Sequence, residues 1–238
     1  MEDIKKILPK LNKWYENKFL LDESNEKLIN FLNNSSKLYI ETTQVVGSFV
    51  LNFPKNFMKY KCGFILDYTY LLSELCFVSN LMNELETNYN KRGYFDRKNQ
   101  ILLISTNDFI LLPNSYTILD KFVVLEKIIK NTKEGKLNTD LNNLRKLSFW
   151  KKHKNKLQFS IFKIIVGIRN LMVHYPTANI FLNAGLAENE EEEYWIKILY
   201  NLEKEEKNNL LDNPFNCLTK IIFLLAAKLI LNKILEYK

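Results

Sequence analysis

Glycine and proline are scarce in this sequence, which has 6 and 5 of them among its 238 residues. Both residues mark turns and interrupt regular structure, so their scarcity argues against a turn-rich β-sandwich or β-barrel and favours long helices. Histidine and arginine are also rare: the chain has 2 histidines, and 4 of its 34 basic residues are arginines. An arginine close to a histidine would therefore stand out.

Cysteine is too sparse for a disulfide framework or a zinc site. The three cysteines, Cys62, Cys76 and Cys217, form no Cys-x-x-Cys pair, which fits a reducing cytoplasm. Long hydrophobic runs are missing too. The N-terminus lacks the apolar core of a signal peptide, and the most apolar window, 221–231, is interrupted by Lys228. Because this window is too short and too charged to span a bilayer, we expect a core helix, no membrane and a cytoplasmic protein.

The composition that remains is that of a globular protein, with 47% hydrophobic and 26% charged residues. This balance allows a sizeable core in a chain of this length. The formal net charge is +7. Such a charge suits nucleic acid or an anionic membrane as a partner, although lysine-rich proteins are often basic without one.

Apolar residues recur at helical spacing along most of the chain. This periodicity predicts helices over about 24–33, 36–53, 63–89, 116–131, 138–150, 157–175, from about 190 onwards, and 215–237. Pro54 is expected to end the second of these. No repeat or low-complexity linker divides the chain, so we expect one all-α, multi-helix bundle.

The segment 90–115 breaks the helical pattern. Two apolar runs, 101–105 and 109–112, flank a short polar turn at 106–108. Two short apolar runs around polar turn residues indicate a small β-hairpin or an irregular insertion.

Arg169, Asn170 and His174 form the group of residues best suited to chemistry. They lie near the end of the most apolar predicted helix. Asn170 and His174 are four residues apart and share a helix face, whereas about 140° of rotation separates Arg169 from His174. Pro176 disfavours helical geometry at Tyr175, so the helix should end there. His174 then lies in the last turn, within reach of the long Arg169 side chain.

These residue types suit RNA cleavage. A helix C-terminus favours the imidazolium form of His174 while the neighbouring Arg169 cation opposes it, and this balance lets the histidine take and give protons. Arginine donates two parallel hydrogen bonds to a phosphate. Internal attack by a 2′-hydroxyl needs no metal, and the sequence has no His-x-His or Cys/His cluster, so we predict no metal and no cofactor. In the structural alternative, His174 caps helix carbonyls and Arg169 pairs with an acid.

The segment 168–175, which spaces Arg169, Asn170 and His174 as Arg-Asn-x3-His, resembles the signature of HEPN domains. The resemblance implies a single HEPN-like helical domain over 1–238, with the helices of residues 1–60 as an extension. It implies a metal-independent endoribonuclease in which His174 transfers protons, Arg169 binds the scissile phosphate and Asn170 orients the site. It also implies RNA as substrate, a homodimer with a composite active site, and a role as a toxin or in anti-phage defence.

A basic turn precedes the motif helix. Lys151, Lys152 and Lys154 lie about 25 Å from His174 by helical rise, and Tyr175 directly follows the motif. We predict that these lysines and Tyr175 bind RNA. Two alternatives stay open: a non-catalytic HEPN module that binds RNA, a nucleotide or a partner protein such as a nucleotidyltransferase antitoxin, and a helical structural protein with a fortuitous motif.

Overall fold

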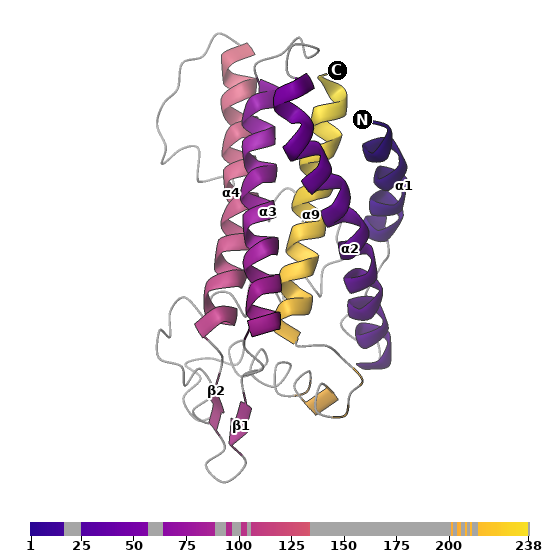
Figure 1. The fold of residues 1–238 in the computed structure, drawn as a ribbon, viewed down its shortest axis with the longest axis vertical. Coiled ribbons are helices and arrows are strands. Elements are labelled where there is room, and N and C mark those ends of the chain that lie inside the picture. The colour runs from indigo at the N-terminus through magenta and orange to yellow at the C-terminus, as the bar shows by residue number, and fades with distance from the viewer. Residues whose placement is uncertain are drawn as a thin grey trace.

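Five long helices and one short hairpin make up the part of the chain that the structure, a computed structural model, describes. The described residues are 1–16, 25–56, 64–88, 94–96, 101–103, 106–133 and 214–237, with 201, 204, 205, 208 and 210. The elements are α1 (Glu2–Glu16), α2 (Asn25–Asn56), α3 (Phe64–Asn88), β1 (Tyr94–Asp96), β2 (Ile101–Leu103), α4 (Thr106–Lys133) and α9 (Pro214–Glu236). The predicted all-α bundle is confirmed (Figure 1).

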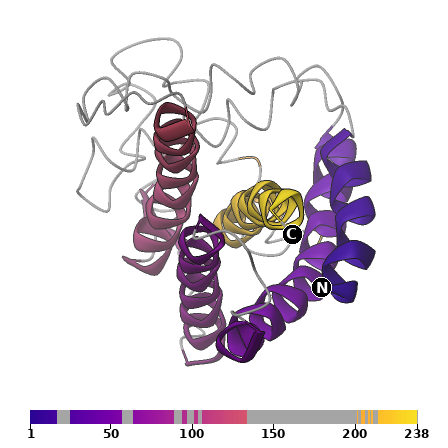
Figure 2. The same ribbon diagram turned by 90° about the horizontal axis from the view of Figure 1, so that it is seen from above.

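Helix α9 is the centre of this bundle. It packs against α1, α2, α3 and α4, which stand around it when the bundle is seen from above (Figure 2). Every residue of 217–227 is buried, so three turns of the helix have no solvent face. The apolar window is therefore a core helix, as predicted. None of the described helices is long and apolar enough to cross a membrane.

One continuous core joins side chains from all five of these helices. Helices were expected within residues 1–60, but no bounds were predicted for α1. Its apolar residues recur at helical spacing: Ile4, Ile7, Leu8, Leu11 and Trp14 are all buried. The Trp14 indole N–H donates to Ser35 Oγ of α2 at 2.9 Å. On the surface, Lys10 pairs with Glu41 at 2.6 Å and joins the same two helices.

Helix α3 agrees closely with its prediction, 63–89, whereas α2 corrects two predictions. The helices expected over 24–33 and 36–53 are one continuous helix. The polar residues between them do not break it, because the buried Ser35 hydroxyl donates to the carbonyl of Phe31 at 2.7 Å. Pro54 does not end the helix either, since α2 continues to Asn56. A proline this close to a helix end removes one hydrogen bond of the last turn.

The insertion near 90–115 contains a hairpin, but its strands differ from those expected. β1 and β2 are antiparallel and pair Tyr94 with Leu103 and Asp96 with Ile101. The second apolar run, 109–112, belongs to α4 and not to a strand. Leu111 and Leu112 begin a stripe that continues at helical spacing through the buried Ser115 and Leu119, so these two leucines belong to the helical core.

Candidate functional site

The residues predicted to carry the chemistry lie outside the described residues. This holds for Arg169, Asn170 and His174, for the RNA-binding candidates Tyr175, Lys151, Lys152 and Lys154, and for the predicted helices 138–150 and 157–175. Their arrangement in space therefore stays a prediction. The described part of the chain contains two polar clusters that no sequence motif indicated, and we consider each in turn.

The first cluster lies where α3 begins and α4 and α9 end, at the end of the bundle that carries the C-terminus (Figure 1). The fully buried Tyr68 donates its hydroxyl proton to Glu126 Oε1. The other carboxylate oxygen of Glu126 lies 3.2 Å from Lys233 Nζ. Lys233 also pairs with Glu236 at 2.7 Å. A tyrosine, two carboxylates and an ammonium thus form one chain of hydrogen bonds between three helices.

Aromatic rings pack beside these hydrogen-bonded side chains. The rings of Tyr68 and Tyr237 stack with their centres 5.9 Å apart, and Phe122 lies 6.2 Å from Tyr68. Lys133 Nζ donates to the Tyr237 hydroxyl at 3.1 Å. Below, these residues with Glu126, Lys233 and Glu236 are called the terminal cluster.

Two groups of the terminal cluster, Tyr68 and Lys233, have raised pKa values. Burial raises the pKa of Tyr68 far above its ordinary value, and the neighbouring Glu126 carboxylate raises it further. Burial lowers the pKa of Lys233, but its bonds to Glu236 and Glu126 outweigh burial, so this pKa is raised as well. Tyr68 therefore stays protonated and Lys233 stays charged. The raised pKa values take both groups further from proton exchange near pH 7. The hydrogen bond and the ion pair of Glu126 join α3, α4 and α9.

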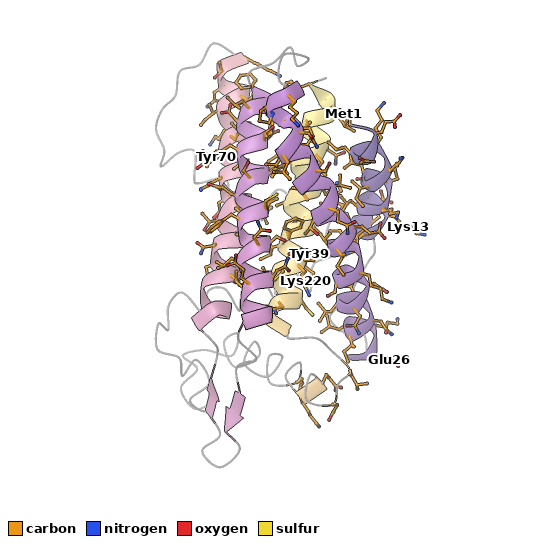
Figure 3. All side chains as sticks on the ribbon, viewed as in Figure 1. Met1, Lys13, Glu26, Tyr39, Tyr70 and Lys220 are labelled. Atoms are coloured by element: carbon orange, nitrogen blue, oxygen red, sulfur yellow. The ribbon has the colours of Figure 1, made fainter. Side chains whose placement is uncertain are left out.

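The second cluster lies inside the bundle between α2, α3 and α9. The Tyr39 hydroxyl of α2 and Ser79 Oγ of α3 share a hydrogen bond of 2.6 Å. The buried Lys220 of α9 places its Nζ 5.7 Å from the centre of the Tyr39 ring, and Figure 3 shows these two residues close together. The Phe223 ring meets the Tyr39 ring edge-on at 4.9 Å.

Lys228 repeats this arrangement two turns further along α9. Its Nζ lies 4.3 Å from the centre of the Tyr15 ring of α1. The electron-rich face of an aromatic ring attracts an ammonium, and the attraction grows when water is excluded. Two of the three lysines of α9 therefore contact tyrosine rings. Lys220 is buried and Lys228 is partly buried. In the sequence, the one sign of these contacts was the presence of Lys228 within the apolar window 221–231.

Neither cluster is a metal site. Across the residues that the structure describes, no three His, Cys, Asp or Glu side chains are grouped so that they could hold a metal ion. Cys217 is fully buried, with its Sγ 3.9 Å from Ser36 Oγ. Cys76 is partly buried, and burial raises the pKa of its thiol, which makes it a poor nucleophile.

Comparison with known proteins yields no relative: no protein-family model matches the chain, and no curated protein or solved structure matches it significantly. A functional argument must therefore start from the motif residues and from the all-α bundle.

Proposed function

We propose that this chain is a metal-independent endoribonuclease of the HEPN type. The observation that carries the proposal is the Arg-Asn-x3-His motif formed by Arg169, Asn170 and His174. The all-α architecture of the described helices is compatible with the fold that such a motif requires. The net charge of +7 favours a polyanionic substrate.

The proposed reaction is internal transesterification. His174 takes the proton of a ribose 2′-hydroxyl, whose oxygen attacks the adjacent phosphorus, and the bond to the 5′-oxygen of the next nucleotide breaks. A proton returns to that leaving oxygen, so the products carry a 2′,3′-cyclic phosphate and a 5′-hydroxyl. Arg169 binds the phosphate oxygens as negative charge builds on them, and Asn170 orients the site. The lysines of the basic turn and Tyr175 hold the flanking RNA, and a second copy completes the cleft.

An RNA cleavage assay in EDTA tests the proposal. The wild-type protein should release fragments with 2′,3′-cyclic phosphate ends, and His174→Ala should slow cleavage by about 100-fold or more, because proton transfer is lost. His153→Ala is the matched control, since it removes the chain's other histidine, which lies in the basic turn. This control should cleave at the wild-type rate. Cleavage that survives His174→Ala in pure protein would refute the proposal.

A binding module without catalysis is the second candidate, and the net charge of +7 also supports it. In this case the motif residues contact RNA, a nucleotide or a partner protein such as a nucleotidyltransferase antitoxin. RNA binding or complex formation without turnover by the wild-type protein would favour this candidate. Expression in a host separates the two as well, because a catalytic toxin should slow growth and His174→Ala should relieve it.

A further inference from the structure

Three large apolar side chains are exposed along the outer face of α3. Leu66, Tyr70 and Phe77 are 52%, 64% and 67% exposed. They are four and seven residues apart, so they fall within about 40° of the helix circumference. Figure 3 shows Tyr70 at the outer edge of the bundle, far from Tyr39 and Lys220 in the interior. Exposed large apolar side chains that share one helix face are typical of an interaction surface.

The spacing along this face is that of a helix–helix contact. Positions 66, 70, 73, 77, 80 and 84 step alternately by four and three residues, which is the heptad spacing by which one helix packs against another. We call these six residues the α3 seam: Leu66, Tyr70, Ser73, Phe77, Asn80 and Glu84. The seam extends over about 27 Å. Among the described helices, α3 packs against α2, α4 and α9 on its other sides, as the view from above shows (Figure 2).

The charge of α3 is opposite to that of the whole chain. The helix contains four acidic residues and no lysine or arginine, in a protein of net charge +7. Asp67 and Glu74 lie on one flank of the α3 seam by helical rotation, and Glu84 lies within it. Asp67 and Glu84 are exposed, whereas Glu74 pairs with Lys121 of α4 at 2.6 Å.

The acidic charge of α3 indicates which kind of helix can bind at the α3 seam. A second copy of α3 would bring acidic residues against acidic residues, and like charges across a helix seam disfavour pairing. A helix with lysines or arginines beside its apolar positions would place an opposite charge against Asp67. Charge complementarity therefore favours a basic helix over a second copy of this chain.

We propose that the α3 seam binds a basic amphipathic helix of a partner protein. The apolar residues of the partner pack between Leu66, Tyr70 and Phe77 at matching heptad positions. Its basic residues run along the flank that carries Asp67. The proposal does not depend on RNA cleavage, because it uses no motif residue.

Binding of designed peptides to the full-length protein tests this proposal. The probes are two helical peptides of about 20 residues, with leucines at heptad spacing and either lysines or glutamates at all flanking positions. Titration calorimetry should show saturable binding of the lysine peptide and none of the glutamate peptide. The double variant Tyr70→Ser/Phe77→Ser should weaken binding at least about tenfold. Ile40→Ser, which replaces an exposed apolar residue of α2, is the matched control and should bind like the wild type.

A charge exchange gives an independent readout. Asp67→Lys should weaken binding of the lysine peptide and strengthen binding of the glutamate peptide. A change in stability would not produce this reversal. Because Tyr70 and Phe77 are exposed, their double variant should keep the wild-type thermal unfolding midpoint. Asp67→Lys should lower the midpoint slightly, because Asp67 lies in the first turn of α3, where a positive charge opposes the helix dipole. The proposal is wrong if the lysine peptide does not bind, or if it binds the double variant as tightly as the wild type. It is also wrong if the double variant turns a dimer into a monomer, because the seam would then join two copies of this chain.

Discussion

Helices α9 and α3 are both rich in apolar residues, but the bundle uses them differently. The central part of α9 is buried on every side, and each lysine within its apolar run faces a tyrosine ring from a neighbouring helix. Helix α3 buries one face and exposes Leu66, Tyr70 and Phe77 on the other. A helix in a bundle ordinarily buries apolar side chains and exposes charged ones, and each of these two helices departs from that pattern. In α9 the exceptions are one buried and one partly buried lysine that contact tyrosine rings, and in α3 they are apolar side chains that the core leaves exposed.

The largest effect is expected at Phe223, near the middle of α9. Its ring is 1% exposed and packs edge-on against Tyr39. Phe223→Ala leaves a cavity in a core closed on all sides, so it should lower the free energy of unfolding by about 3–5 kcal/mol. Urea unfolding followed by circular dichroism measures this change. A loss below about 1 kcal/mol would contradict the position of α9 at the centre of the core.

The terminal cluster should give the next largest effect. Tyr68→Phe keeps the ring but removes the hydroxyl that bonds the Glu126 carboxylate. The loss of a hydrogen bond to a partly buried charged group should destabilise the protein by about 1–3 kcal/mol. Tyr70→Phe, two residues further along the same helix, is the control. Because Tyr70 is exposed, this variant should unfold like the wild type.

The same cluster predicts how stability depends on pH. An unfolded tyrosine loses its proton near pH 10, whereas the pKa of Tyr68 in the folded protein is raised by burial and by Glu126. Above about pH 10 the folded state therefore holds more protons than the unfolded state, and stability should fall as pH rises. The raised pKa of Lys233 acts in the same direction. Urea unfolding at about pH 8 and about pH 10.5 should show this fall, and Tyr68→Phe should reduce it.

A smaller loss is expected at the interior cluster. Tyr39→Phe keeps the ring beneath Lys220 and removes the hydroxyl that bonds Ser79 at 2.6 Å. Loss of this neutral bond should cost about 0.5–1.5 kcal/mol. If Tyr39→Phe destabilises more than Tyr68→Phe, the bond to Glu126 does not have the extra strength expected of a charged partner.

The smallest effect on stability is expected at Phe77, which completes the comparison with Phe223. Phe77→Ala removes the same ring from a side chain that is 67% exposed, so the free energy of unfolding should change by no more than about 0.5 kcal/mol. A loss as large as that of Phe223→Ala would mean that the outer face of α3 is covered. If Phe77→Ala is as stable as the wild type but binds the lysine peptide more weakly, the α3 seam is a binding surface.

The sequence predicted the helices whose apolar stripes are long and uninterrupted. The expected ranges 63–89 and 215–237 differ from α3 and α9 by one residue at each end. Prediction was wrong where polar residues suggested a break. Ser35 is polar, yet its hydroxyl is bonded within the helix and to Trp14, so α2 continues through it. The apolar run 109–112 is compatible with a strand or a helix, and only its packing in the core decides.

The clusters were beyond prediction for a different reason. Tyr68, Glu126 and Lys233 come from three helices and are separated by 58 and 107 positions. Such contacts depend on how the helices pack, and no period in the sequence encodes them. Arg169, Asn170 and His174 are the opposite case, because their local spacing alone suggested a function. Their geometry lies outside the described residues and stays a prediction.

The contact between Trp14 and Ser35 gives α1 an optical reporter of its own. The chain has three tryptophans, and replacing Trp150 and Trp195 with phenylalanine would leave Trp14 as the sole indole fluorophore. Its side chain is buried, bonded to Ser35 and stacked on Phe31 at 6.0 Å. Emission from this indole should therefore lie at short wavelength while α1 stays docked and shift to the red when the helix detaches. Stopped-flow fluorescence would then show whether α1 joins the bundle together with α9 or after it.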